Sequence, residues 1–132
     1  MVNQATALIV EDAETCASTL EILLGSIAGL NILTASTAER AWELLDESSN
    51  EIHALVTDLH MPGMDGLELI RRVRADPRHR RLRIVVITGS TDPNVPELVL
   101  KTGADAVFSK PYSPARVREK LEQLLKNEMR SA

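Results

Sequence analysis

Short runs of apolar residues alternate with longer stretches of helical periodicity along the whole chain. The short runs predict five strands, at residues 5–10, 32–35, 54–58, 84–88 and 106–109. Such alternation is typical of a parallel sheet that is covered by helices on both faces. The pattern therefore predicts an α/β protein before any single residue is considered.

Helical periodicity predicts five helices after these strands: from Asp12 to Gly29, over residues 38–47 and 66–75, from Val95 or Pro96 onward, and from Ser113-Pro114 to about Asn127. Thr37 is the expected N-cap of the second helix. Trp42 lies beside the inward stripe of that helix and is expected to pack there rather than to form a ligand platform. Asp76 precedes a proline and avoids helical angles, so the third helix should stop there.

Five strands alternating with five helices fit a doubly wound, flavodoxin-like sheet, for which the usual strand order is 2-1-3-4-5. Right-handed crossovers would then place helices on both faces of the sheet. At 132 residues the chain is expected to be a single domain over residues 1–132, with an ordered core over residues 5–127.

Composition narrows the classes of function. Hydrophobic residues make up 44% of the chain and charged residues 26%, as in soluble globular proteins, and the 2% aromatic share predicts an aliphatic core. A net charge of -4 gives no general attraction to nucleic acid or to anionic membranes. Cys16 is a lone cysteine, and no apolar run approaches the roughly 20 residues of a membrane span. We therefore expect a cytoplasmic protein without a membrane partner.

Seven arginines form the strongest block of charge, at positions 71, 72, 74, 78, 80, 81 and 83. A nucleic-acid surface is one reading of such a block. Because no aromatic residues are interleaved and the whole chain is acidic, we interpret the block as a solvated helix end and loop.

Four of the predicted strands lead into polar side chains: Glu11-Asp12, Asp58, Thr88 and Lys110. The carboxyl ends of parallel strands meet at one edge of a sheet, and ligands bind where the winding direction reverses, between the first and third strands. Taken singly, each residue has an ordinary structural explanation. Together at one edge, they favour a functional site.

The chemistry of this group suggests a metal and a phosphoryl group. Three neighbouring carboxylates repel one another by about 4 kcal/mol per close pair at an effective dielectric of 20, so a cation is expected among them. Oxygen ligands favour Mg²⁺, and Mn²⁺ would also fit. A carboxylate beside a metal, a hydroxyl and an ammonium can attack a phosphoryl group, whose oxygens Thr88 and Lys110 would stabilise.

The chain resembles the receiver domain of two-component response regulators, of the kind that regulates chemotaxis. The resemblance covers nearly the whole chain and rests on motifs in the family's order: Glu11-Asp12, Asp58-Leu59-His60-Met61-Pro62-Gly63-Met64-Asp65-Gly66, Thr88-Gly89, Gly103-Ala104-Asp105 and Lys110-Pro111. The run that begins at Asp58 is the most specific of them.

The resemblance implies a role for each site residue. Asp58 would accept a phosphoryl group from a histidine kinase or phosphotransfer protein, Lys110 would contact that group, and Thr88 would move to hydrogen-bond it. Magnesium would be held by Glu11, Asp12, Asp58 and the backbone carbonyl of His60. The family also implies a cis peptide at Lys110-Pro111, and side chains at His60 and Ser90 that tune dephosphorylation.

The family further implies a signalling module rather than an enzyme acting on external substrates, since receivers catalyse only their own phosphorylation and dephosphorylation. Receivers meet partners or form homodimers through the fourth helix, fifth strand and fifth helix, so a downstream partner or a second copy is expected there. One residue departs from the pattern: Val107 stands where receivers commonly carry Tyr or Phe. Phe108 should face the opposite side of the sheet, so coupling is expected through Thr88 and residues 90–96 instead.

Three other hypotheses remain open. The receiver could belong to a larger regulator or hybrid kinase. A metal-dependent phosphohydrolase would use a similar aspartate, but it would need a second acid two residues later, where this chain has His60. A receiver-like module that is never phosphorylated is the third hypothesis, and the complete set of acidic, Thr and Lys residues argues against it.

Overall fold

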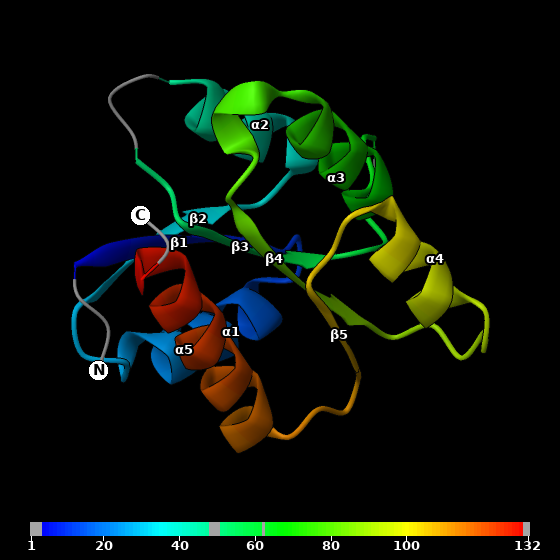
Figure 1. Cartoon of the computed structure of the whole chain (residues 1–132). Coiled ribbons are helices and arrows are strands. Elements are labelled where there is room, and N and C mark those ends of the chain that lie inside the picture. The colour runs from blue at the N-terminus through cyan, green and yellow to red at the C-terminus, as the bar shows by residue number, and fades with distance from the viewer. Residues whose placement is uncertain (1–3, 48–50, 62, 131–132) are drawn as a thin grey trace.

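A parallel five-stranded sheet forms the centre of the protein, as the computed structural model shows (Figure 1). The structure describes residues 4–47, 51–61 and 63–130, so Pro62 of the most specific motif lies outside the described residues. The strands are β1 (Ala5–Val10), β2 (Leu30–Ala35), β3 (Ala54–Asp58), β4 (Arg83–Thr88) and β5 (Ala106–Ser109). Their order, β2-β1-β3-β4-β5, confirms the predicted flavodoxin-like topology.

Helices cover both faces of the sheet. They are α1 (Glu14–Gly25), α2 (Ala38–Asp46), α3 (Gly66–Ala75), α4 (Val95–Thr102) and α5 (Pro114–Arg130), with a 3₁₀ turn η1 (Pro77–His79) between α3 and β4. Figure 1 shows α1 and α5 below the sheet, with α2 and α3 above it and α4 beside β5. None of the described helices is both long and apolar enough to cross a lipid bilayer.

The sheet separates two apolar clusters, because successive strand residues face opposite sides. Leu8 and Leu55 pack with α2, α3 and α4, whereas Ile9 and Val56 pack with α1 and α5. Val107 belongs to the first cluster and Phe108 to the second, which confirms that their side chains face opposite ways. Burying each such aliphatic side chain contributes about 1.5–3 kcal/mol, so this aliphatic core stabilises the sheet in spite of its few aromatic residues.

Local hydrogen bonds fix where the helices begin. The Thr37 side chain accepts from the Arg40 backbone N–H at 3.1 Å, which confirms it as the N-cap of α2. Asp65 does the same for α3, accepting from the Glu68 N–H at 2.9 Å. At Gly66, the first residue of α3, a Cβ would collide with the Asp58 carbonyl oxygen. Glycine therefore lets α3 start directly against the end of β3.

The predicted end of α1 and the predicted start of β2 were wrong. Helix α1 ends at Gly25 instead of Gly29, because Ser26 caps it and the Ser26 hydroxyl donates to the Leu23 carbonyl at 2.6 Å. Gly29 has a φ of +85° and lies in the turn that leads into β2. Strand β2 then begins at Leu30, two residues before the predicted start, since Leu30 already pairs with Ala5.

Charged side chains hold the edge of the sheet where the strands begin. The Arg74 guanidinium donates to the Gly103 carbonyl at 2.9 Å and to Asp105 Oδ2 at 3.2 Å, and that same Asp105 oxygen accepts from the Ile84 N–H at 2.8 Å. Arg74 is only 23% exposed, so the interpretation of the arginine block as solvated was wrong here. Trp42 packs against the apolar cluster, as predicted, and it also meets the His79 ring edge-on at 6.1 Å.

Candidate functional site

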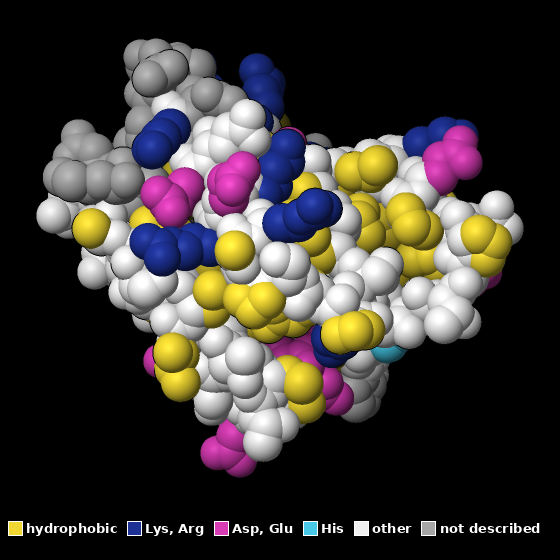
Figure 2. All heavy atoms as spheres, turned by 90° about the horizontal axis from the view of Figure 1, so that it is seen from below, with side chains coloured by type: hydrophobic (Ala, Val, Ile, Leu, Met, Phe, Trp, Pro, Cys, Tyr) yellow, Lys and Arg dark blue, Asp and Glu magenta, His cyan; other side chains and the backbone are white. Residues whose placement is uncertain are grey.

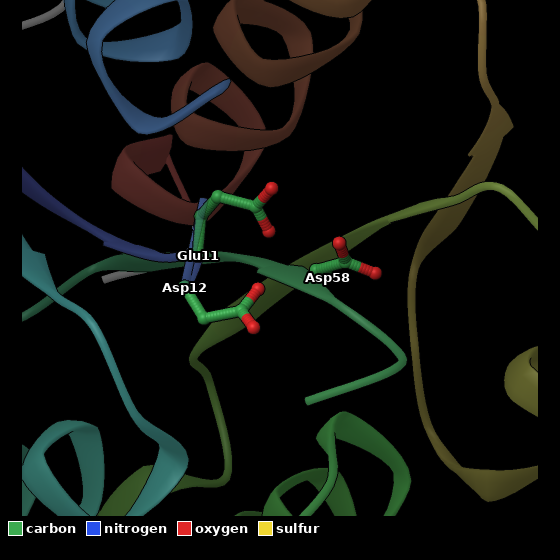
Figure 3. A group of neighbouring side chains, drawn as sticks. All are labelled: Glu11, Asp12 and Asp58. Atoms are coloured by element: carbon green, nitrogen blue, oxygen red, sulfur yellow. The ribbon is translucent and has the colours of Figure 1, made fainter. Parts of the chain in front are cut away.

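Three carboxylates converge where β1 and β3 end. Glu11 and Asp12 follow β1, and Asp58 is the last residue of β3, the strand that pairs with β1. One oxygen of each carboxylate lies within 4.8 Å of the others, and Figure 3 shows the three side chains as neighbours at the ends of β1 and β3. The juxtaposition predicted from the strand ends is therefore present in the structure.

Lys110 reaches this acidic cluster from the end of β5. Its ammonium lies 3.0 Å from Asp58 Oδ2 and 3.5 Å from Glu11 Oε1. The Lys110 N–H donates to the Thr88 carbonyl at 2.8 Å, which extends the pairing of β4 with β5 to the lysine itself. The peptide bond from Lys110 to Pro111 is cis, as the family resemblance implied.

Thr88 and His60 lie at the same edge of the sheet, but only His60 is hydrogen-bonded to Asp58. Thr88 is 1% exposed at the end of β4, and its hydroxyl accepts from the Ser90 N–H at 3.1 Å rather than bonding to Asp58. The His60 N–H donates to Asp58 Oδ1 at 3.2 Å, while its side chain is exposed. Among the described residues, no donor hydrogen-bonds the His60 carbonyl, so this oxygen is free to bind a cation.

Glu11 and Asp58, the two least exposed acids of the cluster, have pKa values shifted in opposite directions. Burial, together with the hydrogen bond to Asp58 and its charge, raises the pKa of Glu11 to about 7. Burial also raises the pKa of Asp58, but hydrogen bonds from Glu11, Lys110 and the His60 N–H outweigh it, so that the pKa of Asp58 lies below its usual value. One proton therefore sits on Glu11 in preference to Asp58, which keeps Asp58 ionised near neutral pH.

The donor set fits a hard divalent cation. Three carboxylate oxygens lie together, and the free His60 carbonyl comes from the residue two beyond Asp58. Magnesium prefers oxygen ligands and usually keeps several waters while it binds one or two carboxylates. A cation at this point would favour the ionised form of Glu11, which burial and the neighbouring Asp58 otherwise disfavour.

A cavity of about 410 Å³ opens beside Asp58. Its walls come from α1 and from the segment that joins β5 to α5, and include Cys16, Leu20 and Tyr112. Sequence reasoning missed this cavity because it considered Cys16 only as a lone cysteine and gave Tyr112 no role. In Figure 2, which views the face with α1 and α5, hydrophobic side chains are interspersed with acidic and basic ones.

The comparisons with known proteins agree with this geometry. A family model described as the response regulator receiver domain matches residues 7–122. Chemotaxis protein CheY1 of Helicobacter pylori strain J99 is 35% identical over 120 residues, which cover 89% of this chain and 94% of that protein.

Two solved structures are similar over almost their whole length. The signal receiver domain of a signal transduction histidine kinase from Syntrophus aciditrophicus is 28% identical, with a TM-score of 0.83, covering 93% of this chain and 91% of that one. A CheY-like response regulator receiver domain protein from Methanospirillum hungatei JF-1 has a TM-score of 0.87 at 22% identity, covering 98% of this chain and 100% of that one. The second likeness supports the fold alone.

Proposed function

This chain belongs to the response regulator receiver domain family, and from that premise we propose that Asp58 is its phosphoacceptor. The phosphoryl donor would be a histidine kinase or a phosphotransfer protein. The observation that carries this proposal is the position of the Lys110 ammonium, 3.0 Å from the Asp58 carboxylate in a cluster of three acids. An ionised, partly buried carboxylate with a cation against it is suited to nucleophilic attack on phosphorus.

In the proposed reaction, an Asp58 carboxylate oxygen forms a bond to phosphorus as the bond from phosphorus to the donor histidine nitrogen breaks. The imidazole leaves and takes up a proton from solvent. Lys110 stabilises negative charge on the transferring oxygens, since its ammonium already faces Asp58. Magnesium, or manganese in its place, would be held by Glu11, Asp12, Asp58 and the His60 carbonyl and would neutralise the phosphoryl oxygens.

The proposed switch runs from Thr88 toward α4. The Thr88 hydroxyl holds the Ser90 N–H, and Ser90 in turn accepts from the Asp92 N–H at 3.2 Å. A phosphoryl group on Asp58 would attract the Thr88 hydroxyl and release the Ser90 N–H. The segment before α4 would then adopt a second arrangement, and a partner that binds this arrangement better would shift the population toward it.

The partner surface is proposed around α4 and β5, where Leu98 and Leu100 are 47% and 48% exposed. A downstream protein, an attached output module or a second copy of this chain would bind there. Similar proteins include a CheY1 of nearly the same length and the receiver domain of a histidine kinase. The likeness therefore leaves open whether the receiver acts alone or within a longer protein. The single domain over residues 1–132 and a cytoplasmic location remain predictions.

A phosphohydrolase is the competing hypothesis from a different class. It would need a second acid near position 60 to activate the leaving group or the water. His60 stands there with an exposed side chain, and only its backbone N–H contacts Asp58. We therefore propose that the chain turns over no external phosphoester and catalyses only its own phosphorylation and dephosphorylation.

Intact-protein mass spectrometry tests the proposal directly. Wild type is incubated with Mg²⁺ and a small phosphodonor such as acetyl phosphate, beside Asp58→Asn as the matched variant. We expect a single phosphate adduct on wild type and none on Asp58→Asn. An undiminished adduct on the variant would move the acceptor to another residue, and turnover of an added phosphoester by wild type would favour the hydrolase.

A further inference from the structure

Glu39 holds the segment that carries the proposed carbonyl ligand. It lies in the first turn of α2, and its Oε2 accepts from the Met64 N–H at 3.1 Å. Hydrogen bonds from the backbone N–H groups of Met64 and of Glu39 itself keep the pKa of Glu39 below its usual value, and the charge of Arg72 lowers it further. The contact joins residues 25 apart in sequence and links α2 to the segment between β3 and α3.

Gly63 makes room for this carboxylate. Its φ of +76° is one that side-chain-bearing residues rarely adopt, and a Cβ there would lie 2.6 Å from Glu39 Oε2. The glycine therefore serves two purposes: it turns the segment and it lets Glu39 pass over the turn to reach Met64. The hydrogen bond to Met64 and the space at Gly63 give the Glu39 carboxylate a defined position. An acid that was merely solvated at the start of a helix would need neither of them.

Other contacts of the described residues hold this segment at its base and near its middle. Asp58 ends β3, and the Gly66 N–H donates to the Leu59 carbonyl at 3.0 Å, which closes the loop at its base. Between these ends the Met61 side chain is buried in the cluster shared with α2 and α3. Among the described residues between Leu59 and Gly66, two backbone N–H groups are held by side chains: that of His60 by Asp58 at the end of β3, and that of Met64 by Glu39 of α2.

We propose that Glu39 is a positioning residue for the cation site: by accepting from the Met64 N–H, it holds the segment after β3 from which the His60 carbonyl would bind the cation. The inference rests on the proposed function. Outer groups that orient metal ligands typically change metal affinity by about 10–100-fold when removed. Because Glu39 is exposed and acts through the backbone, we expect the lower end of that range, about a tenfold loss of Mg²⁺ affinity in Glu39→Ala.

Calorimetric titration with Mg²⁺ tests this inference on four proteins: wild type, Glu39→Ala, Glu39→Gln and Glu43→Ala. Gln keeps a side-chain oxygen that can accept from Met64, so Glu39→Gln should retain most of the affinity. Glu43 lies one turn further along α2, where it pairs with Arg40 at 3.7 Å, and it serves as the matched control. Loss in Glu39→Ala with retention in the other two variants is the expected pattern.

Two further readouts separate positioning from a general structural role. The Met64 amide resonance in an ¹⁵N-labelled sample should move in Glu39→Ala, because the N–H loses its acceptor. Phosphorylation of Glu39→Ala by acetyl phosphate should be slow at low Mg²⁺ and reach the wild-type rate when Mg²⁺ is saturating. A defect that persists at saturating Mg²⁺, or an unchanged Mg²⁺ affinity, would overturn the inference. If wild type takes up no phosphate, the proposed function itself fails, and the role of Glu39 fails with it.

Discussion

The ammonium of Lys110 lies 3.0 Å from Asp58 Oδ2, although 52 residues separate the two in sequence. Both side chains leave the carboxyl ends of strands that lie on either side of β4. Burial lowers the pKa of Lys110, but the hydrogen bond to Asp58 and the nearby acids raise it more, so the lysine stays charged at neutral pH. The acidic cluster and the charged Lys110 ammonium therefore lie together as one ion-paired group.

Replacing Lys110 by Ala should slow phosphorylation of Asp58 by about tenfold or more, since a charge that stabilises the transferring oxygens is lost. Lys110→Arg keeps the positive charge but not the compact ammonium, and it should be intermediate. The rate of phosphate incorporation from acetyl phosphate, followed by intact mass, measures the effect. A Lys110→Ala variant that is phosphorylated at the wild-type rate would contradict the assigned role.

Without Mg²⁺, the contribution of Glu11 to the free energy of unfolding should fall as pH rises from about 4.5 to about 7. Over this window the folded protein keeps a proton on Glu11, whose pKa is raised from 4.5 to about 7, while the unfolded chain has released it. The stability that this group contributes is complete below pH 4.5 and is lost as pH passes 7, with a slope of at most about 1.4 kcal/mol per pH unit.

Urea denaturation of wild type and Glu11→Gln in EDTA, at several pH values, measures this dependence. Glu11→Gln cannot ionise at position 11, so the stability of wild type relative to the variant should decline across the window. Asp58 has a lowered pKa and acts at more acidic pH, so it does not disturb the comparison. A difference between the two proteins that stays constant from pH 4.5 to pH 7 would contradict the prediction.

Removing the Thr88 hydroxyl should leave phosphorylation of Asp58 intact and weaken the conformational response of the segment before α4. Thr88→Val keeps the buried volume but offers no acceptor for the Ser90 N–H. We expect the variant to accept phosphate, with smaller changes in the amide resonances of residues 90–95 on phosphorylation than wild type shows. Equal changes in ¹⁵N spectra of the two proteins would show that coupling does not depend on this hydroxyl.

Gly103→Ala should lower the free energy of unfolding by about 1–3 kcal/mol. Gly103 ends α4 with a φ of +130°, and a Cβ there would lie 2.6 Å from Arg74 Cγ. Gly25→Ala is the matched control, because Gly25 lies at the end of α1 with no atom within 4 Å of an added Cβ. Urea denaturation should find the control unchanged or slightly more stable.

Much of the fold follows from local pattern. The bounds of β1, β3, β5 and α3 agree with the prediction, because runs of β-branched and apolar residues, helix caps and a proline mark those ends directly. The end of α1 was misplaced since two signals compete there: Gly29 resembles a helix terminator, but the Ser26 hydroxyl caps the helix first. The turn η1 carries no periodicity and was not predicted.

The acidic cluster was predictable for a different reason. The carboxyl ends of parallel strands must share an edge, so Glu11, Asp58 and Lys110 could be brought together from strand positions alone. The contact between Glu39 and Met64 was not predictable in this way. An acid in the first turn of a helix is common, because it favours the helix dipole. Its reach depends on the backbone path at Gly63, which the sequence does not specify.

Arg74, which donates to the Gly103 carbonyl and to Asp105, lies at the edge of the sheet where the strands begin. The acidic cluster lies at the opposite edge. These hydrogen bonds therefore stabilise the end of the sheet that lies far from the atoms that would react. Because the His60 side chain is exposed, we expect substitutions there to cost the fold little stability and predict that they would alter the lifetime of a phosphoryl group on Asp58. A library randomised at His60 and Ser90 should accordingly yield a high proportion of folded proteins, and would allow the timing of the response to be engineered independently of its scaffold.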